Sequence, residues 1–152
     1  MKIYYREKSG GIEILRCFGI EGRVEIPGMI DDKLVISAAP YAFSSHMDEK
    51  EDLKNASLWE VSDGLEFGRE EHVLAGNDVE EIVFPYTLKE IGRYIFYGCG
   101  NLKKLEFSDS LMQIGCGAFT GCHALEKLTV HMRQGKKSGV KEMLGEMWQR
   151  ID

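Results

Sequence analysis

The chain has few cysteines, and no two of them lie at a spacing typical of metal or redox sites. Four cysteines occur among 152 residues, too few for a disulfide-stapled scaffold of this length. They are Cys17, Cys99, Cys116 and Cys122, and none belongs to a C-x-x-C motif. The sequence therefore disfavours a zinc or redox centre, and free thiols fit a reducing cytosol.

Long apolar runs are also absent. No stretch approaches the roughly 18–20 apolar residues that span a bilayer, so we expect no membrane insertion. The opening residues, MKIYYREKSGG, are charged by Arg6 and have no apolar core behind a basic leader. We therefore expect no secretory signal and a cytoplasmic location.

Positive charge is scarce. The formal net charge is −6, and residues 47–81 carry twelve acidic and three basic side chains. An acidic chain is a poor candidate for binding nucleic acid by phosphate neutralisation. The acidic stretch suits a basic partner or a hard cation as well as a solvated surface. The solvated surface is favoured, because the acids are not arranged as a calcium loop.

Catalytic signatures are missing as well. No G-x-S-x-G, P-loop or dinucleotide-binding motif occurs. The histidines have no nucleophile at a familiar catalytic spacing; they are His46, His72, His123 and His131. We predict a protein without catalytic, cofactor-binding or metal-binding residues.

What the chain does contain is a gapless 23-residue repeat. Residues 79–101 align with 102–124 at seven identical positions, and repeats of this length indicate a solenoid. The identities are Phe84/Phe107, Leu88/Leu111, Ile91/Ile114, Gly92/Gly115, Phe96/Phe119, Gly98/Gly121 and Cys99/Cys122. A third copy begins with Leu125, Leu128 and Val130.

The spacing inside one repeat predicts its local structure. Leu105 and Phe107 are two residues apart and point inward from a strand, so Lys104 and Glu106 point outward. Leu111 and Ile114 are three apart, as on a turn of 3₁₀ or short helical structure. One coil cannot bury its own apolar side, whereas stacked coils share a continuous core.

These motifs resemble BspA-type leucine-rich repeats. IVFPYTLKEIGRYIFYGCGNL and LEFSDSLMQIGCGAFTGCHAL carry the pattern I-P-x-x-L-x-x-I-G-x-x-A-F-x-G-C-x-x-L. The segment IPGMIDDKLVISAAPYAF is similar to an earlier coil of that family, although Ala38-Ala39 replaces Ile-Gly. The resemblance implies a bacterial protein, and it implies a surface or secreted adhesion role if a leader has been removed.

We predict one domain with an α/β solenoid fold: a right-handed leucine-rich repeat with short parallel strands. Residues 1–23 form a β-hairpin cap around Ser9-Gly10-Gly11, residues 24–130 form the repeats, and residues 131–152 form a helical cap. Residues 47–78 are interpreted as one degenerate coil with an insertion. Two alternatives to the helical cap stay open: a truncated run of repeats, or a helix that docks into a partner.

The stacked outward positions are the candidate partner-contact residues. Glu81, Lys104 and Lys127 share one position of the repeat, and Val83, Glu106 and Thr129 share another. Neighbouring Glu80, Lys103 and Glu126 alternate in charge, which favours a self-neutralising ladder over a binding face. Tyr86, Tyr94 and Tyr97 are added as candidates because the next coil does not keep them.

Two further interpretations concern the cysteines. Cys99 and Cys122 stack one coil apart, and buried free thiols are favoured over a disulfide. A metal set of Cys99, Cys116, Cys122 and His123 is disfavoured, because the repeat points these side chains in different directions.

The predicted function is a non-catalytic protein-protein interaction or scaffolding module. Its protein partner is unknown, and we expect a monomer or a weak oligomer. The alternative is a glycan- or matrix-binding adhesin fragment, which requires the tyrosines to cluster on one accessible groove.

Overall fold

The first two strands form an antiparallel hairpin. The computed structural model describes residues 1–46, 53–61, 70–133 and 139–148. Strand β1 (Lys2–Lys8) pairs with β2 (Gly11–Gly19). Ser9 and Gly10 make the turn with φ of 51° and 82°, a conformation that glycine adopts without steric cost. The predicted N-terminal hairpin is confirmed.

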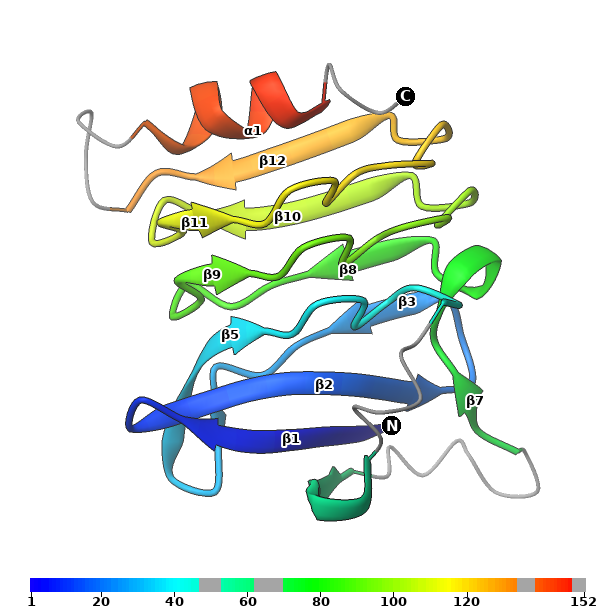
Figure 1. Cartoon of the computed structure of the whole chain (residues 1–152), viewed down its shortest axis with the longest axis vertical. Coiled ribbons are helices and arrows are strands. Elements are labelled where there is room, and N and C mark those ends of the chain that lie inside the picture. Colours follow the sequence, from blue (N-terminus) through cyan, green and yellow to red (C-terminus); the bar gives the residue numbers. More distant parts are fainter. Residues whose placement is uncertain (47–52, 62–69, 134–138, 149–152) are drawn as a thin grey trace.

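Parallel strands 23 residues apart form one wall of a solenoid. Lys104 pairs with Glu81 on one side and with Lys127 on the other, which is the predicted register. The sheet has the order β12-β10-β8-β3 (Figure 1). Its strands are β3 (Arg23–Glu25), β8 (Glu81–Val83), β10 (Lys104–Ser108) and β12 (Lys127–His131).

The opposite wall is also made of short parallel strands. There β5 (Lys33–Ala38), β9 (Glu90–Ile91) and β11 (Gln113–Ile114) stack in sequence, and β2 runs parallel to β5. Strand β4 (Met29–Ile30) turns back onto β5. The helical pieces predicted for this wall are wrong. Coils stacked at about 4.8 Å leave no room for helices about 10 Å wide.

Glycines keep the backbones of this wall close together. A Cβ on Gly115 would lie 2.1 Å from the Arg93 nitrogen, and one on Gly92 would lie 2.3 Å from the Pro40 nitrogen. Ala39 occupies the same position in the first coil, whose neighbour is β2, and its N–H donates to Ile14 O at 2.8 Å. The Ala38-Ala39 departure therefore falls where the stack of coils begins.

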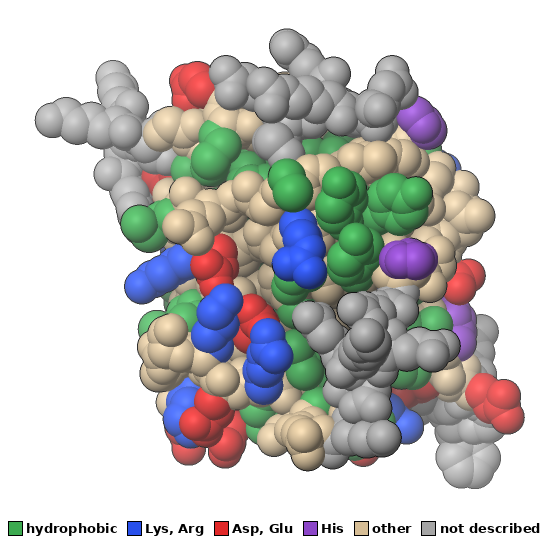
Figure 2. All heavy atoms as spheres, in the orientation of Figure 1, with side chains coloured by type: hydrophobic (Ala, Val, Ile, Leu, Met, Phe, Trp, Pro, Cys, Tyr) green, Lys and Arg blue, Asp and Glu red, His purple; other side chains and the backbone are tan. Residues whose placement is uncertain are grey.

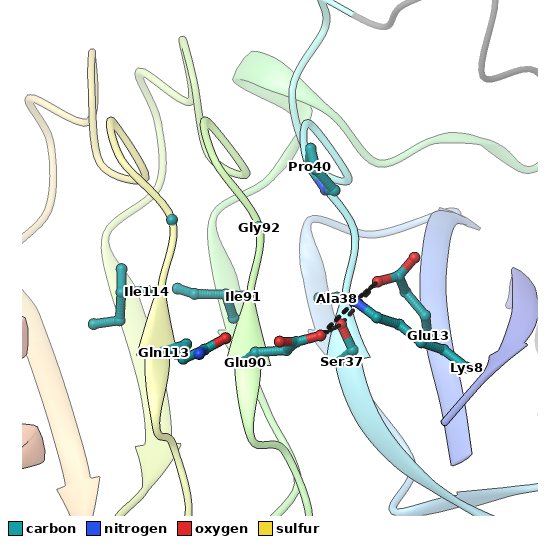
Figure 3. Close-up of a pocket in the computed structure, with 11 residues that line it drawn as sticks. Lys8, Glu13, Ser37, Ala38, Pro40, Glu90, Ile91, Gly92, Gln113 and Ile114 are labelled. Carbon is teal, nitrogen blue, oxygen red and sulfur yellow. Dashed lines mark hydrogen bonds and ion pairs between the residues drawn. The ribbon is translucent and has the colours of Figure 1, made fainter. Parts of the chain in front are cut away.

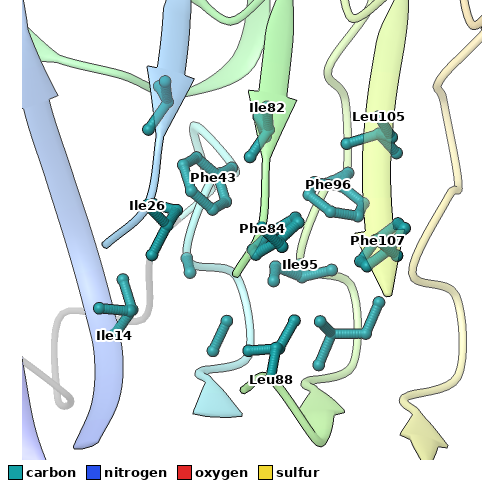
Figure 4. Close-up of a cluster of buried hydrophobic side chains, with 14 of the residues drawn as sticks. Ile14, Ile26, Phe43, Ile82, Phe84, Leu88, Ile95, Phe96, Leu105 and Phe107 are labelled. Carbon is teal, nitrogen blue, oxygen red and sulfur yellow. The ribbon is translucent and has the colours of Figure 1, made fainter. Parts of the chain in front are cut away.

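Stacked phenylalanines fill the interior. The Phe96 and Phe119 rings lie 5.7 Å apart at 8°, and the Phe84 and Phe107 rings lie 4.9 Å apart at 9°. Phe43 continues the first column at 6.0 Å from Phe96 (Figure 4). Identical side chains at one repeat position thus become neighbours in space, which is why the repeat preserves them.

Cys99 and Cys122 are buried free thiols, as predicted. The Cys99 thiol donates to Phe43 O at 3.1 Å, and the Cys122 thiol donates to Phe96 O at 3.3 Å. Burial raises the pKa of both thiols, and that of Cys17, to about 12. Each cysteine of the repeat therefore binds the coil before it.

The described parts of residues 47–78, which are 53–61 and 70–78, do not form the predicted degenerate coil. Strand β8 pairs directly with β3, although 58 positions separate Arg23 from Glu81. Strand β6 (Ser57–Glu60) instead extends the hairpin through β1, and β7 (His72–Val73) pairs with β2. Both pairings are antiparallel and are made with the hairpin strands, so β6 and β7 lie outside the stack of parallel coil strands. Residues 47–52 and 62–69 lie outside the described part.

A helix ends the described chain, as predicted. Helix α1 (Val140–Trp148) lies beside β12 at the end of the stack (Figure 1). Val140 and Leu144 are buried and belong to the same hydrophobic cluster as Phe119. Residues 134–138 and 149–152 of the predicted helical cap lie outside the described residues.

Candidate binding face

The outer side of the β3-β8-β10-β12 sheet brings the predicted strand positions together. One row runs across the sheet as Arg23, Glu81, Lys104 and Lys127. A second row runs parallel to it as Glu25, Val83, Glu106 and Thr129. The six strand residues predicted as contacts therefore lie on one face. Arg23 and Glu25 extend it and were missed, because the chain between β3 and β8 breaks the 23-residue period.

The charges on this face are only partly paired. Arg23 lies 3.6 Å from the carboxylate of Glu81. Lys104 and Lys127 are exposed neighbours, and neither has an ion-pair partner within the described residues. Nor do the side chains of Glu80, Lys103 and Glu126 pair with one another there, so the self-neutralising ladder does not form as ion pairs.

A groove of about 430 Å³ continues the second row. Tyr86, 59% exposed, stands at this groove with the Arg133 guanidinium 4.5 Å above its ring. His131 Nε2 lies 3.4 Å from Glu106 Oε2. Its position follows from the register, because His131 pairs with Ser108. The face thus combines an exposed aromatic ring with acidic and basic groups.

Tyr94 and Tyr97 belong to a different cluster. The Tyr94 ring stacks on Tyr41 at 5.6 Å and 18°, and meets Tyr97 edge-on at 5.9 Å. His46 contacts Tyr41 and Tyr97. Figure 2 shows hydrophobic side chains gathered over the loops that follow β9 and β11. The three predicted tyrosines therefore do not converge, since Tyr86 alone lines the groove.

A polar pocket that the sequence did not indicate lies over the opposite wall. It has a volume of about 420 Å³, and its lining includes Glu13, which is only 1% exposed (Figure 3). Glu13 accepts hydrogen bonds from Arg6 Nε at 2.7 Å, Lys8 Nζ at 3.1 Å and Ser37 Oγ at 2.9 Å. A buried carboxylate needs such partners, because burial of an unpaired charge is costly.

Lys8 links this buried carboxylate to a partly exposed one, that of Glu90. Its Nζ lies 2.5 Å from Glu90 Oε1, and Ser37 Oγ lies 3.0 Å from the same oxygen. The hydrogen bond with Glu90 is the largest cause of the raised pKa of Lys8. The same bond lowers the pKa of Glu90. The four side chains of this network come from four strands: Lys8 from β1, Glu13 from β2, Ser37 from β5 and Glu90 from β9. No local sequence pattern therefore predicts the network.

The described residues contain no cluster of three or more His, Cys, Asp or Glu side chains arranged to hold a metal ion. Within the same residues, no helix has both the length and the apolar character needed to cross a membrane.

Comparison with known proteins identifies the repeats. Residues 70–139 match the BspA type leucine rich repeat region (6 copies). This part of the chain is a BspA-type leucine-rich repeat region, as its motifs suggested. No curated protein matches the chain.

Two solved bacterial structures share the fold. A leucine rich cell surface protein from Faecalibacterium prausnitzii A2-165 is 19% identical, with a TM-score of 0.55 over 85% of this chain. The chain covers 30% of that protein's length. A leucine-rich repeat protein from Bacteroides capillosus ATCC 29799 is 16% identical, with a TM-score of 0.53. The match covers 86% of this chain and 94% of that one.

Proposed function

We propose that the chain is a non-catalytic protein-interaction module and that its partner binds the outer face of the β3-β8-β10-β12 sheet. The observation that carries the proposal is the groove at Tyr86. Exposed tyrosines fixed beside a groove are frequent anchors of protein interfaces. The core requires the inward residues of these strands, whereas their outward residues are free to serve recognition.

The charge pattern favours a partner that carries both signs. Lys104 and Lys127, which have no ion-pair partner among the described residues, form a basic pair in the first row. Glu25 and Glu106 supply acids in the second. Two residues of a strand separate the rows by roughly 6.6 Å. A partner that places acidic groups over the lysines and a basic group over the glutamates complements this face.

The proposal is tested with the full chain as immobilised bait in extract from its own organism. Lys104→Glu with Lys127→Glu, and separately Tyr86→Ala, should each reduce capture of the same protein by at least about tenfold. Lys89→Glu is the matched control, because Lys89 is exposed and lies outside the face. If all the face variants capture that protein as well as the unaltered chain does, the proposed face is wrong.

The glycan- or matrix-binding alternative has weaker support. It requires the three tyrosines on one groove, and the separation of Tyr86 from Tyr94 and Tyr97 counts against it. A glycan array probed with the unaltered chain and with Tyr94→Ala tests it directly. Clear glycan binding lost in Tyr94→Ala, without capture of any protein, would favour the alternative.

Two locations have support from different observations. The free thiols of Cys99 and Cys122 suit the cytoplasm, which we propose as the location. The Faecalibacterium protein is named as a cell surface protein, which supports the alternative. Fractionation of cells that express the natural gene distinguishes the two.

A further inference from the structure

Adjacent coils are joined at their turns by a regular row of backbone hydrogen bonds. In the coil of residues 79–101, the N–H groups of alternate residues donate to the coil of residues 102–124. Tyr94 N–H donates to Cys116 O at 3.0 Å, Phe96 N–H to Ala118 O at 3.1 Å, and Gly98 N–H to Thr120 O at 3.0 Å. The first coil repeats the pattern, since Tyr41 and Phe43 donate to Arg93 O and Ile95 O. Each turn therefore offers alternate N–H groups to the carbonyl groups of the next turn.

The last turn of the stack, which belongs to the coil of residues 102–124, offers the same N–H donors without acceptors. The equivalent positions are Gly117, Phe119 and Gly121, and their N–H groups have no acceptor within the described part of the chain. Gly117 and Gly121 are partly exposed, whereas Phe119 is 1% exposed. An N–H group that is shielded from water and unbonded is unfavourable, so this row of donors favours an added acceptor strand.

Helix α1 covers this end only in part. Its Val140 and Leu144 are buried in the hydrophobic cluster that contains Phe119. The carbonyl groups inside an α-helix bond along its own axis and cannot face a row of alternate donors. The helix therefore shields apolar surface, and within the described residues it supplies no acceptor to the backbone donors of the last turn.

The opposite end of the stack is closed. The carbonyl of Ala42 is equivalent to those of Ile95 and Ala118, which accept from the preceding coil, and there Arg16 Nη1 donates to it at 3.0 Å. A second copy stacked head to tail would need that carbonyl as an acceptor. This bond therefore argues against a second copy as the occupant of the open end.

We propose that the last turn is a second interaction surface, which binds an extended polypeptide segment of a partner protein as one more coil. The segment presents carbonyl groups at three alternate residues to Gly117, Phe119 and Gly121. Its middle residue of the three is apolar, as Ile95 and Ala118 are. The next residue is aromatic and stacks on Phe119, as Phe119 stacks on Phe96 at 5.7 Å.

Phe119 is 1% exposed, so the side chains that cover it must move aside for the segment to reach its ring. A short helix held by a few buried side chains such as Val140 and Leu144 can be displaced by a segment that restores the backbone bonds. This surface is separate from the outer face of the β3-β8-β10-β12 sheet and does not rest on the function proposed above.

Amide hydrogen exchange followed by NMR on the full chain tests the open donors. Gly98 and Gly121 are a matched pair, with φ of 75° and 86° at one repeat position. The Gly121 amide should exchange at least about tenfold faster than that of Gly98, and Gly117 faster than Tyr94. Equal protection in both pairs would show that the donors are satisfied and would overturn the proposal.

A peptide supplies the second arm of the test. The probe is residues 113–124 with Cys116→Ser and Cys122→Ser, a sequence that already adds to a coil in this fold. It should slow exchange at Gly117 and Gly121, and Leu144→Ala in the protein should tighten its binding by about tenfold. The probe with Phe119→Ala is the control and should bind more weakly. No protection by the probe in either protein would refute the surface.

The proposals for the two surfaces can be refuted independently of each other. Lys104→Glu with Lys127→Glu should leave peptide binding at the last turn unchanged, because those lysines lie on the outer face of the sheet. Loss of peptide binding in this variant, with the fold intact, would contradict the placement of the peptide.

Discussion

Arg16 lies in the core and donates a hydrogen bond from Nη1 to the carbonyl oxygen of Ala42 at 3.0 Å. The same nitrogen donates to Tyr41 O at 2.9 Å. In the later coils, equivalent carbonyl groups accept from the backbone of the preceding coil. A side chain of the hairpin thus takes the place of a missing coil, and burial lowers the pKa of this guanidinium.

Arg16→Met should destabilise the fold although it removes a buried charge. The Ala42 carbonyl would be left without its donor, at a cost of about 1–3 kcal/mol in the free energy of unfolding. Urea denaturation followed by circular dichroism measures the change. Arg23→Met, on the exposed strand face, is the control and should change stability little. A loss no greater than that of the control would mean that Arg16 does not cap the stack.

Gly115→Ala should be severely destabilising. The added Cβ would lie 2.1 Å from the Arg93 backbone nitrogen, so the two coils must separate. We expect a loss of about 3 kcal/mol, seen as a lower midpoint of thermal unfolding. Gly139→Ala is the matched control, because its Cβ meets nothing within 4 Å. Similar midpoints for the two variants would disprove the close approach of the coils.

The Lys8–Glu90 pair predicts a loss of stability at both extremes of pH. The pKa of Glu90 is lowered from 4.5, so its contribution is present above that value and is lost as pH falls through the lower folded pKa. The pKa of Lys8 is raised from 10.5, so its contribution is present below that value and is lost as pH rises through the higher folded pKa.

Lys8→Met removes this pair together with the hydrogen bond from Lys8 to Glu13. The variant should be less stable by about 1 kcal/mol near neutral pH, a modest value because both side chains are partly exposed. The difference from the unaltered chain should shrink in strong acid and in strong base. Urea midpoints across the pH range measure it, and a difference that stays constant with pH would exclude the pair as its source.

The thiols should react in two classes. Cys116 is exposed, whereas Cys17, Cys99 and Cys122 are buried with pKa values raised to about 12. A thiol reagent such as DTNB should modify one cysteine rapidly in the native protein and the others only on unfolding. Cys116→Ser should abolish the rapid phase. Rapid modification in that variant would show that a buried cysteine is accessible.

Repetition explains why so much of the solenoid was predictable. Once residues 79–101 and 102–124 share a period, Glu81, Lys104 and Lys127 must become neighbours on one face. The same argument buries Phe96 over Phe119. The helical pieces expected near Ile114 were wrong because the three-residue spacing of Leu111 and Ile114 also fits a bent, extended coil. The close approach of the backbones at Gly115 is what decides between a helical piece and an extended coil.

The candidate binding face was only partly predictable. Tyr86 was recognised as a residue that the core does not require, but its pairing with Arg133 depends on how the chain leaves β12. The cluster at Glu13 joins the hairpin strands β1 and β2 to β5 and β9, which are distant from them in sequence. Tyr94 stacks on Tyr41, which lies 53 positions earlier in the chain.

By itself, the sequence determined the coil, its period and its buried positions, because identical spacing places identical side chains in one column. Tertiary structure decided where the repetition stops. Ser57–Glu60 joins the hairpin instead of the stack, Arg16 closes one end, and Gly117 and Gly121 keep open donors at the other. The physical reason is that the end of a stack lacks the neighbour that the repeat presumes. Its backbone groups must then find partners that no periodic pattern encodes.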